Sequence, residues 1–227
     1  MIFVTSDLHG DIERFRQKEI KRLKKTDTLI ILGDFGFIWD GSKKEQRNLK
    51  WISRRRYTVL FIDGSHENFD LLSQYPVVDY AGGQAHEICG KLHHLMRGQV
   101  YNIEGQKLLC FGGGESLDKE SRTEGNTWWH SEAPNHEEFD RCMQSLKKVD
   151  NAVDYILTHD APSKLSTFLH LDKNTVLYEK TPIEAFFDNV YQYIPHKMWV
   201  FGRYHRDQRM GKRAAAVYKA VLPLNKD

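Results

Sequence analysis

The chain has 227 residues, of which 40% are hydrophobic and 28% are charged. A composition of this kind excludes a disordered chain and supplies enough apolar sequence for a substantial core. The formal net charge of +2 is too small to mark a protein that binds nucleic acid through bulk positive charge. We therefore expect one domain over residues 1–227.

The cysteines and the apolar runs indicate the cellular compartment of the protein. Cys89, Cys110 and Cys142 are an odd number without C-x-x-C spacing, which argues against a disulfide framework or a zinc knot. Small buried residues in a reducing cytosol are their expected role. The chain enters a strand within its first residues, which leaves no space for a signal peptide, and no apolar run approaches the ~20 residues that span a bilayer. We expect a cytoplasmic protein that makes no membrane contact.

The first third of the sequence alternates apolar runs with amphipathic segments. Apolar runs predict strands over residues 3–6, 28–32 and 59–62. Between them, a rough apolar stripe predicts a helix over 11–25, and a polar segment with inward-facing apolar residues predicts another over 43–56. Strands separated by helices in this way form parallel sheets with right-handed crossovers.

The remaining elements are shorter and more varied. They are a helix over 68–73, short segments over 87–95 and 99–102, strands over 106–111, 153–157, 198–201 and 214–221, and helices over 135–148 and 181–193. Residues 115–134 have no clear period. A loop of this length in a compact domain is usually functional or disordered, and its adjacent Trp128 and Trp129 indicate order.

Polar side chains of the types that bind metal follow five of the predicted strands. They stand in the stretches Asp7-Leu8-His9, Gly33-Asp34, Gly64-Ser65-His66-Glu67, His159 and Gly202-Arg203-Tyr204-His205. Any one of them has a simpler explanation, because a strand-end His is more often hydrogen-bonded structure and an Asp more often caps a helix. Ligands nevertheless gather at the carboxyl ends of parallel strands, and five such ends together are improbable by chance. Mixed Asp and His ligands suit Mn, Fe or Zn.

The order of these motifs resembles that of the calcineurin-like metallophosphoesterases, which reads D-x-H, G-D, G-N-H-[ED], H and G-H-x-H. The similarity extends from Asp7 to His205, and residues 112–129 resemble a small bacterial and phage branch of that family. The resemblance implies an α/β fold, a four-layered αββα sandwich with two metal ions at the strand ends. It also implies hydrolysis of a phosphomonoester or phosphodiester.

The family pattern assigns roles to individual residues of this chain. The resemblance implies a first divalent ion held by Asp7, His9, Asp34 and His205, with Asp34 bridging to a second ion. It also implies that His66 contacts the scissile phosphate or protonates the leaving oxygen. Two ions about 4 Å apart activate a water and neutralise phosphoryl charge in sites of this kind.

Two positions depart from the family pattern, and both belong to the second ion. Ser65 stands where the family has Asn, and Arg203 stands where it has His, so only Asp34 and His159 remain as ligands. Arginine has no acceptor atom and cannot bind a metal, but its fixed charge repels a cation and pairs with phosphate. Two hypotheses follow. Either one ion is firmly bound and Arg203 replaces the second, or Arg203 turns outward to solvent and the second site is weak or empty.

Three functions fit this sequence. The first is a metal-dependent phosphoesterase that acts on a phosphomonoester or phosphodiester, with nucleotides among the candidate substrates. The second is a catalytically silent relative that binds a phosphate-bearing ligand or partner, which the loss of two ligands at one site favours. The third is a nucleic-acid phosphodiesterase, favoured by the basic stretch over residues 203–213. The first is our main prediction, and the oligomeric state and the metal remain open.

Residues around the predicted site carry weaker expectations. Asp160 and Asp207 follow ligand-like histidines and are candidates to orient them, with the capping of a turn as an equal alternative for each. Several side chains in nearby loops are candidates for substrate contact, although an ordinary surface position is the simpler explanation for each: Asn68, Glu115, Arg122, Glu124 and His130. His93 and His94 lack a spacing partner and are expected to be structural. Adjacent tryptophans more often plug a loop against the core than stack on a base.

Overall fold

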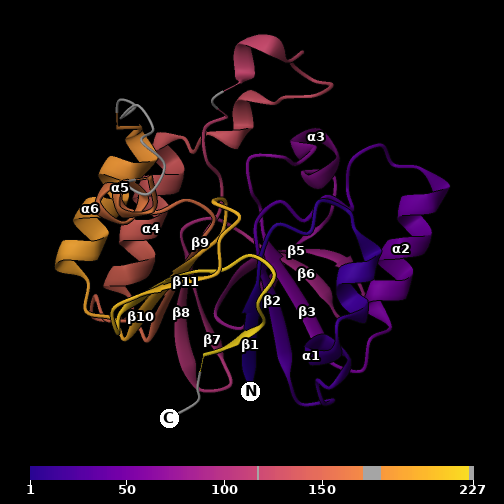
Figure 1. Ribbon diagram of the computed structural model, residues 1–227, viewed down its shortest axis with the longest axis horizontal. Coiled ribbons are helices and arrows are strands. Elements are labelled where there is room, and N and C mark those ends of the chain that lie inside the picture. Colours follow the sequence, from indigo (N-terminus) through magenta and orange to yellow (C-terminus); the bar gives the residue numbers. More distant parts are fainter. Residues whose placement is uncertain (117, 171–179, 225–227) are drawn as a thin grey trace.

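Two stacked β-sheets lie between two layers of helices (Figure 1). The computed structural model describes residues 1–116, 118–170 and 180–224. Within these residues one sheet has seven strands in the order β13-β1-β2-β3-β6-β5-β4, and the other has six in the order β11-β12-β10-β9-β8-β7. The predicted α/β fold, a four-layered αββα sandwich, is confirmed.

The first sheet holds β1 (Ile2–Thr5), β2 (Thr28–Leu32), β3 (Thr58–Ile62), β4 (Val77–Tyr80), β5 (Gly83–Cys89), β6 (Leu92–Leu95) and β13 (Leu222–Pro223). The second holds β7 (Gln99–Ile103), β8 (Gln106–Phe111), β9 (Tyr155–Thr158), β10 (Met198–Phe201), β11 (Gln208–Met210) and β12 (Ala214–Ala216). The helices that cover the first sheet are α1 (Lys18–Lys21), α2 (Lys43–Ser53) and α3 (Phe69–Leu72). Those that cover the second are α4 (His136–Lys147), α5 (Ser163–His170) and α6 (Pro182–Tyr193). Short 3-10 helices are η1 (Ile12–Arg16), η2 (Lys119–Ser121) and η3 (His130–Glu132).

Three apolar clusters fill the three spaces between these layers, and β2 shows how its sequence serves two of them. Ile30 and Leu32 pack in the cluster between the sheets, whereas Leu29 and Ile31 pack in the cluster beneath α2. Side chains of a strand alternate between its two faces, so a strand covered on both faces must be apolar throughout. A third cluster joins the second sheet to α4, α5 and α6.

The central strands of both sheets run parallel. In the first sheet β1, β2 and β3 pair in parallel, as the alternation of strands and helices predicts. In the second, β8, β9 and β10 pair in the same way. Parallel pairing brings the carboxyl ends of these strands to one edge, where the loops that follow them meet.

The helix predicted over 11–25 is wrong in its length. The chain forms η1, then α1, and Gln17 between them has an extended backbone with φ −56° and ψ 145°. The reason is tertiary. Arg14 turns inward and donates hydrogen bonds to the Thr5 hydroxyl (3.0 Å) and the Tyr218 carbonyl (2.7 Å), which hold the first turn against the sheet.

Two further predicted segments are divided. Residues 87–95 do not form one element but parts of β5 and β6, which pair antiparallel and turn at Gly90 with φ +54°. The strand predicted over 214–221 ends at Ala216, because the Asp207 carboxylate accepts hydrogen bonds from the amides of residues 218, 219 and 220. Of the two roles expected for Asp207, the capping of a turn is therefore confirmed, and the orientation of His205 is not.

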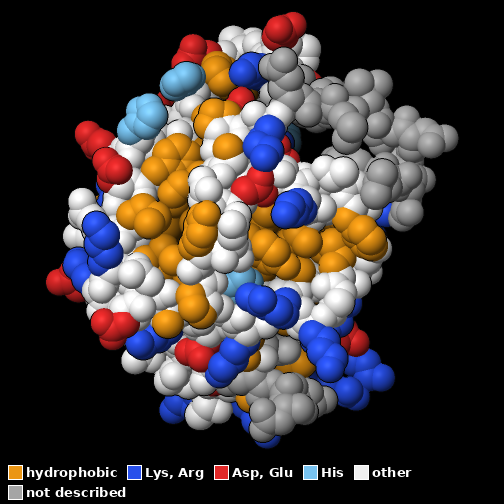
Figure 2. All heavy atoms as spheres, turned by 90° about the vertical axis from the view of Figure 1, so that its left-hand side faces the viewer, with side chains coloured by type: hydrophobic (Ala, Val, Ile, Leu, Met, Phe, Trp, Pro, Cys, Tyr) orange, Lys and Arg blue, Asp and Glu red, His pale blue; other side chains and the backbone are white. Residues whose placement is uncertain are grey.

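The outer face of the second helical layer exposes large apolar side chains. Met143 on α4, Phe168 on α5 and Tyr193 on α6 are all exposed. Figure 2 shows this side of the molecule, where hydrophobic side chains reach the surface among charged ones. In the described part of the chain, no helix has the length and hydrophobicity to cross a membrane.

Candidate metal centre

Side chains from both sheets meet at the edge where the parallel strands end. Asp7, His9 and His205 place possible ligand atoms within 4.8 Å of one another, and so do Asp7, Asp34 and His159. Among the described residues these are the two groups of this kind, and together they contain all five predicted metal ligands. Because Asp7 belongs to both groups, the two form one continuous cluster.

The backbone at this edge is strained. Asp7, His9, Asp34, Arg203 and His205 all have positive φ, between 44° and 66°. Only glycine adopts this left-handed conformation readily, and each other residue in it costs about 1–2 kcal/mol. The strand-end turns therefore hold these side chains in place at a cost in stability.

Glycines at the same edge allow close approach of the ligand side chains. A Cβ atom at Gly33, where φ is +89°, would lie 2.1 Å from Nδ1 of His159. A Cβ atom at Gly64 would lie 2.0 Å from Oδ1 of Asp34. Both contacts are impossible for a side chain, which explains why glycine precedes Asp34 and Ser65.

The first group converges on one point. The Nε2 atoms of His9 and His205 are 3.1 Å apart, and Nε2 of His205 lies 3.5 Å from Oδ1 of Asp7. The second Asp7 oxygen accepts a hydrogen bond of 3.1 Å from the Arg203 amide, whereas Oδ1 is buried without a hydrogen-bond partner. The contact with Asp7 raises the pKa of His205, whereas burial lowers the pKa of His9.

The second group contains a buried imidazole nitrogen that faces a carboxylate. Nδ1 of His159 donates to the Leu32 carbonyl at 3.0 Å, which fixes the orientation of the ring. Nε2 of His159 is buried without a hydrogen-bond partner and lies 3.5 Å from Oδ1 of Asp34. Burial alone would raise the pKa of Asp34, but His159 and His66 outweigh it and the pKa is lowered.

These atoms fit a divalent cation. Buried polar atoms almost always have a partner, yet Oδ1 of Asp7 and Nε2 of His159 have none among the described residues. Carboxylate oxygens and imidazole nitrogens of this geometry are the donors that Mn, Fe and Zn accept together.

Arg203 turns into the protein. Its guanidinium donates to the Glu115 carbonyl, lies 3.3 Å from the Asp160 carboxylate, and its side chain is only 18% exposed. Burial would lower the pKa of Arg203, but Asp160 outweighs it and the pKa is raised, so the group stays charged. A Cβ atom at Gly114 would lie 2.0 Å from Nη1 of Arg203, so this glycine makes space for the guanidinium. The hypothesis that Arg203 turns outward to solvent is wrong.

Of the two roles expected for Asp160, the orientation of His159 is wrong. Its carboxylate accepts hydrogen bonds from the Tyr204 hydroxyl (2.7 Å) and the Ala161 amide (2.8 Å), and it pairs with Arg203. The Leu32 carbonyl, not Asp160, orients His159.

His66 lies between the metal cluster and the long loop over residues 118–134. Nη2 of Arg122 is 2.7 Å from Nε2 of His66, and an arginine only donates, so Nε2 accepts. The hydrogen is therefore on Nδ1 of His66, which lies 3.1 Å from Oδ2 of Asp34 and 3.1 Å from the Ser65 hydroxyl. The Asp118 carboxylate holds Arg122 at 2.8 Å.

A buried ion-pair network holds the C-terminal end of the loop that contains Arg122. Arg97 contacts Oδ2 of Asp63 through Nε at 2.7 Å and Nη2 at 2.6 Å, and His94 contacts Oδ1 at 2.9 Å. The same guanidinium donates to the carbonyls of Ser131 and Glu132. The network ties the end of the long loop to the strand that leads to His66.

The carboxylate of Glu67 holds the turn after β2. It accepts hydrogen bonds from the amides of Phe35 (2.7 Å) and Gly36 (3.3 Å). Burial, together with the nearby charge of Asp34, raises its pKa well above the ordinary value. No motif predicts a role for Glu67, Asp63 or Arg97. The available signal is position, because Glu67 and Asp63 lie within three residues of His66 in the sequence.

The other loop candidates have mainly structural contacts. Asn68 caps α3 by accepting from the Leu71 amide at 3.0 Å, and Glu115 meets Arg203 through its backbone. Glu124 and His130 are exposed. Trp129 is buried and donates to Asp70 at 2.8 Å, as expected for a residue that plugs the loop against the core. Of these candidates only Arg122 reaches His66 with its side chain.

An αββα sandwich whose strand ends gather carboxylates and imidazoles is the architecture of a metallophosphoesterase. The family model of the calcineurin-like phosphoesterases matches residues 1–202, and the chain belongs to this family. A search of curated proteins found no significant match. A crystal structure of phosphopantetheinyl hydrolase (PptH) from Mycobacterium tuberculosis is similar, with 17% identity, a TM-score of 0.46, and coverage of 96% of this chain and 89% of that one.

Proposed function

We propose that this protein is a cytoplasmic, metal-dependent phosphoesterase that hydrolyses a phosphomonoester or phosphodiester, with nucleotides among the candidates. The observation that carries the proposal is the pair of buried, unpartnered donor atoms, Oδ1 of Asp7 and Nε2 of His159, beside the ionised Asp34. Unpaired atoms of this kind, gathered in a cluster of carboxylates and imidazoles, are available to bind a cation. Family membership supplies the phosphate-ester class.

One firmly held ion is the proposed content of this site. Asp7, His9, Asp34 and His205 would hold it, and Mn, Fe or Zn suits these donors. Asp34 and His159 alone would hold a second ion weakly. A bound ion of this kind supplies an activated water and neutralises phosphoryl charge.

Two arginines of the chain are positioned to bind the phosphate. Arg203 keeps its charge beside the second group, where it takes over part of the work of the second ion. Arg122 hydrogen-bonds His66 in the ligand-free chain, and a phosphate oxygen is a stronger acceptor for it than an imidazole. When Arg122 moves to the phosphate, Nε2 of His66 is released, takes a proton from solvent water and passes it to the leaving oxygen.

A catalytically silent relative is the second candidate. One observation favours it: both ring nitrogens of His66 are already engaged, Nε2 by Arg122 and Nδ1 by Asp34. A nucleic-acid phosphodiesterase has less support. In the basic stretch over residues 203–213, Arg203 pairs with Asp160 and Arg213 donates to the His196 carbonyl, so two of its charges contact protein.

Hydrolysis of an aryl phosphomonoester and an aryl phosphodiester in Mn²⁺ tests the proposal. The unmodified chain is compared with an Asp34→Ala variant and a Ser65→Asn, Arg203→His double variant. Turnover well above the Asp34→Ala background supports an enzyme that works with an altered second site. Activity confined to the double variant supports the silent relative.

A further inference from the structure

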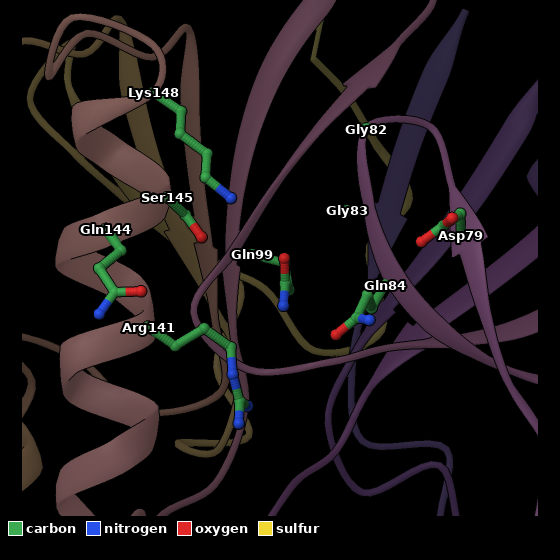
Figure 3. Close-up of a pocket in the computed structure, with 9 residues that line it drawn as sticks. All are labelled: Asp79, Gly82, Gly83, Gln84, Gln99, Arg141, Gln144, Ser145 and Lys148. Atoms are coloured by element: carbon green, nitrogen blue, oxygen red, sulfur yellow. The ribbon is translucent and has the colours of Figure 1, made fainter.

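A polar cavity of about 430 Å³ lies apart from the metal centre, where the edge strands of the two sheets meet α4 (Figure 3). One wall is α4 and its end, the opposite wall is the β4–β5 hairpin, and β7 lies between them. The lining residues are Asp79, Gly82, Gly83, Gln84, Gln99, Arg141, Gln144, Ser145 and Lys148. The cavity shares none of these with the metal centre described above.

The polar groups of this cavity lack partners. Gln99 and Ser145 are largely buried residues, and neither side chain forms a hydrogen bond with another described residue. Both side chains line the cavity, so their hydrogen-bonding groups are available to a bound molecule. Gln84, on the hairpin, likewise has a free side-chain amide within the described chain.

One wall carries two positive charges without counter-ions. Arg141 lies on α4 and Lys148 is the residue that caps its C-terminal end, and neither is paired with a carboxylate of the described residues. Figure 3 shows both side chains directed from the helix toward the cavity, with Asp79 on the far side. The two cations make this wall attractive to an anion.

Hydrogen bonds fix the walls in position before any ligand arrives. The Asn102 amide donates to the Ala81 carbonyl at 2.7 Å, and the Tyr101 hydroxyl donates to the Gln84 carbonyl at 2.5 Å. A Cβ atom at Gly83 would lie 2.8 Å from the Tyr101 ring, so glycine allows the hairpin to approach β7. A rigid cavity binds with a smaller entropic cost than one that must form on binding.

We propose that this cavity binds a phosphorylated sugar. Arg141 and Lys148 take the phosphate, since guanidinium and ammonium groups bind phosphate by charge-assisted hydrogen bonds. The amides of Gln84 and Gln99 and the carboxylate of Asp79 take the hydroxyls. The lining contains no aromatic ring on which a base would stack, which favours a sugar phosphate over a nucleotide.

Calorimetric titration of the full chain in EDTA tests this assignment without interference from hydrolysis. The probes are ribose 5-phosphate, ribose, inorganic phosphate and adenosine 5′-monophosphate. We expect ribose 5-phosphate to bind most tightly, and Arg141→Gln to weaken it about tenfold or more through loss of a charged hydrogen bond. Lys147→Gln is the matched control, because Lys147 is an exposed α4 lysine outside the cavity lining.

A third variant, Arg122→Gln, separates this cavity from the metal centre. Ribose 5-phosphate affinity that is unchanged in Arg122→Gln supports the assignment. The proposal is overturned if Arg122→Gln abolishes binding, if Arg141→Gln binds as tightly as the unmodified chain, or if none of the probes binds at about 1 mM. Equal or tighter binding of phosphate alone or of the nucleotide overturns the choice of a sugar phosphate.

Discussion

Nη2 of Arg122 lies 2.7 Å from Nε2 of His66, and this contact sets which ring nitrogen carries the hydrogen. Arg122 comes from the long loop and His66 from the end of β3, so the loop acts directly on the predicted acid. A substrate phosphate and His66 therefore compete for the same guanidinium.

Replacement of Arg122 tests the outcome of that competition. If Arg122 binds the phosphate, Arg122→Gln lowers kcat/KM for an aryl phosphate about 10- to 100-fold, mainly through KM, because a charged hydrogen bond is lost. Lys119→Gln, an exposed residue of the same loop, is expected to leave both constants unchanged. A rise in kcat for Arg122→Gln would instead identify the arginine as a block on His66.

Metal content tests the asymmetry of the two ligand groups. After loading with Mn²⁺ and dialysis, we expect about one ion per chain, because the second group keeps only two family ligands. His205→Ala should lose that ion, and the Ser65→Asn, Arg203→His double variant should retain a second. Elemental analysis of the dialysed protein gives the count. Two ions bound by the unmodified chain with micromolar affinity would contradict the expectation.

The buried pair of Arg97 and Asp63 is expected to dominate the stability of the loop. Arg97→Met leaves the Asp63 carboxylate buried without its arginine and in contact with His94, and loss of one member of a buried pair costs about 3–5 kcal/mol. Urea denaturation measures the difference. The double variant Asp63→Leu, Arg97→Met should recover part of it, since the fully buried carboxylate is then removed together with its partner. Equal free energies of unfolding for Arg97→Met and the unmodified chain would refute this.

His86 predicts how stability depends on pH. Burial, reinforced by the adjacent His94, lowers the pKa of His86 from 6.5 to about 4. Unfolded chains then bind this proton at a higher pH than folded chains, so the free energy of unfolding falls as the pH decreases from 6.5 toward 4.

The measurement is urea denaturation at several pH values across that range. His86→Gln should show a smaller loss of stability than the unmodified chain. His136→Gln, which replaces an exposed histidine at the start of α4, should show the same loss. An identical pH dependence in His86→Gln would show that His86 does not contribute.

The sequence predicts the sheet core and the meeting of the strand ends because both depend on local patterns. Asp7, Asp34 and His159 each follow an apolar run. The sequence therefore places them at one edge of the sheets, since parallel strands bring such ends together. The partner of Arg203 is not local. Glu115 and Asp160 are 88 and 43 residues away along the chain, so no periodicity indicates which way the guanidinium turns.

The inward turn of Arg14 is unpredictable for the same reason. Its acceptor on Tyr218 is 204 residues away, and that contact changes the helix predicted over 11–25. Asp63 and Arg97 also pair over a long separation, between β3 and the loop before β7. Side-chain partners of this kind are set by the docking of whole layers, which a single sequence does not reveal.

The residues with positive φ at the strand ends come from both sheets. Asp7, His9 and Asp34 follow strands of the first sheet, whereas Arg203 and His205 follow a strand of the second. An ion held by His9 and His205 would therefore link the two sheets at the edge where the strands end. His9 and His205 come close enough to share an ion only when the two sheets are packed in the correct alignment. Retention of the metal therefore reports whether the two sheets are correctly aligned. A core substitution that shifts one sheet against the other should release the ion before the protein unfolds.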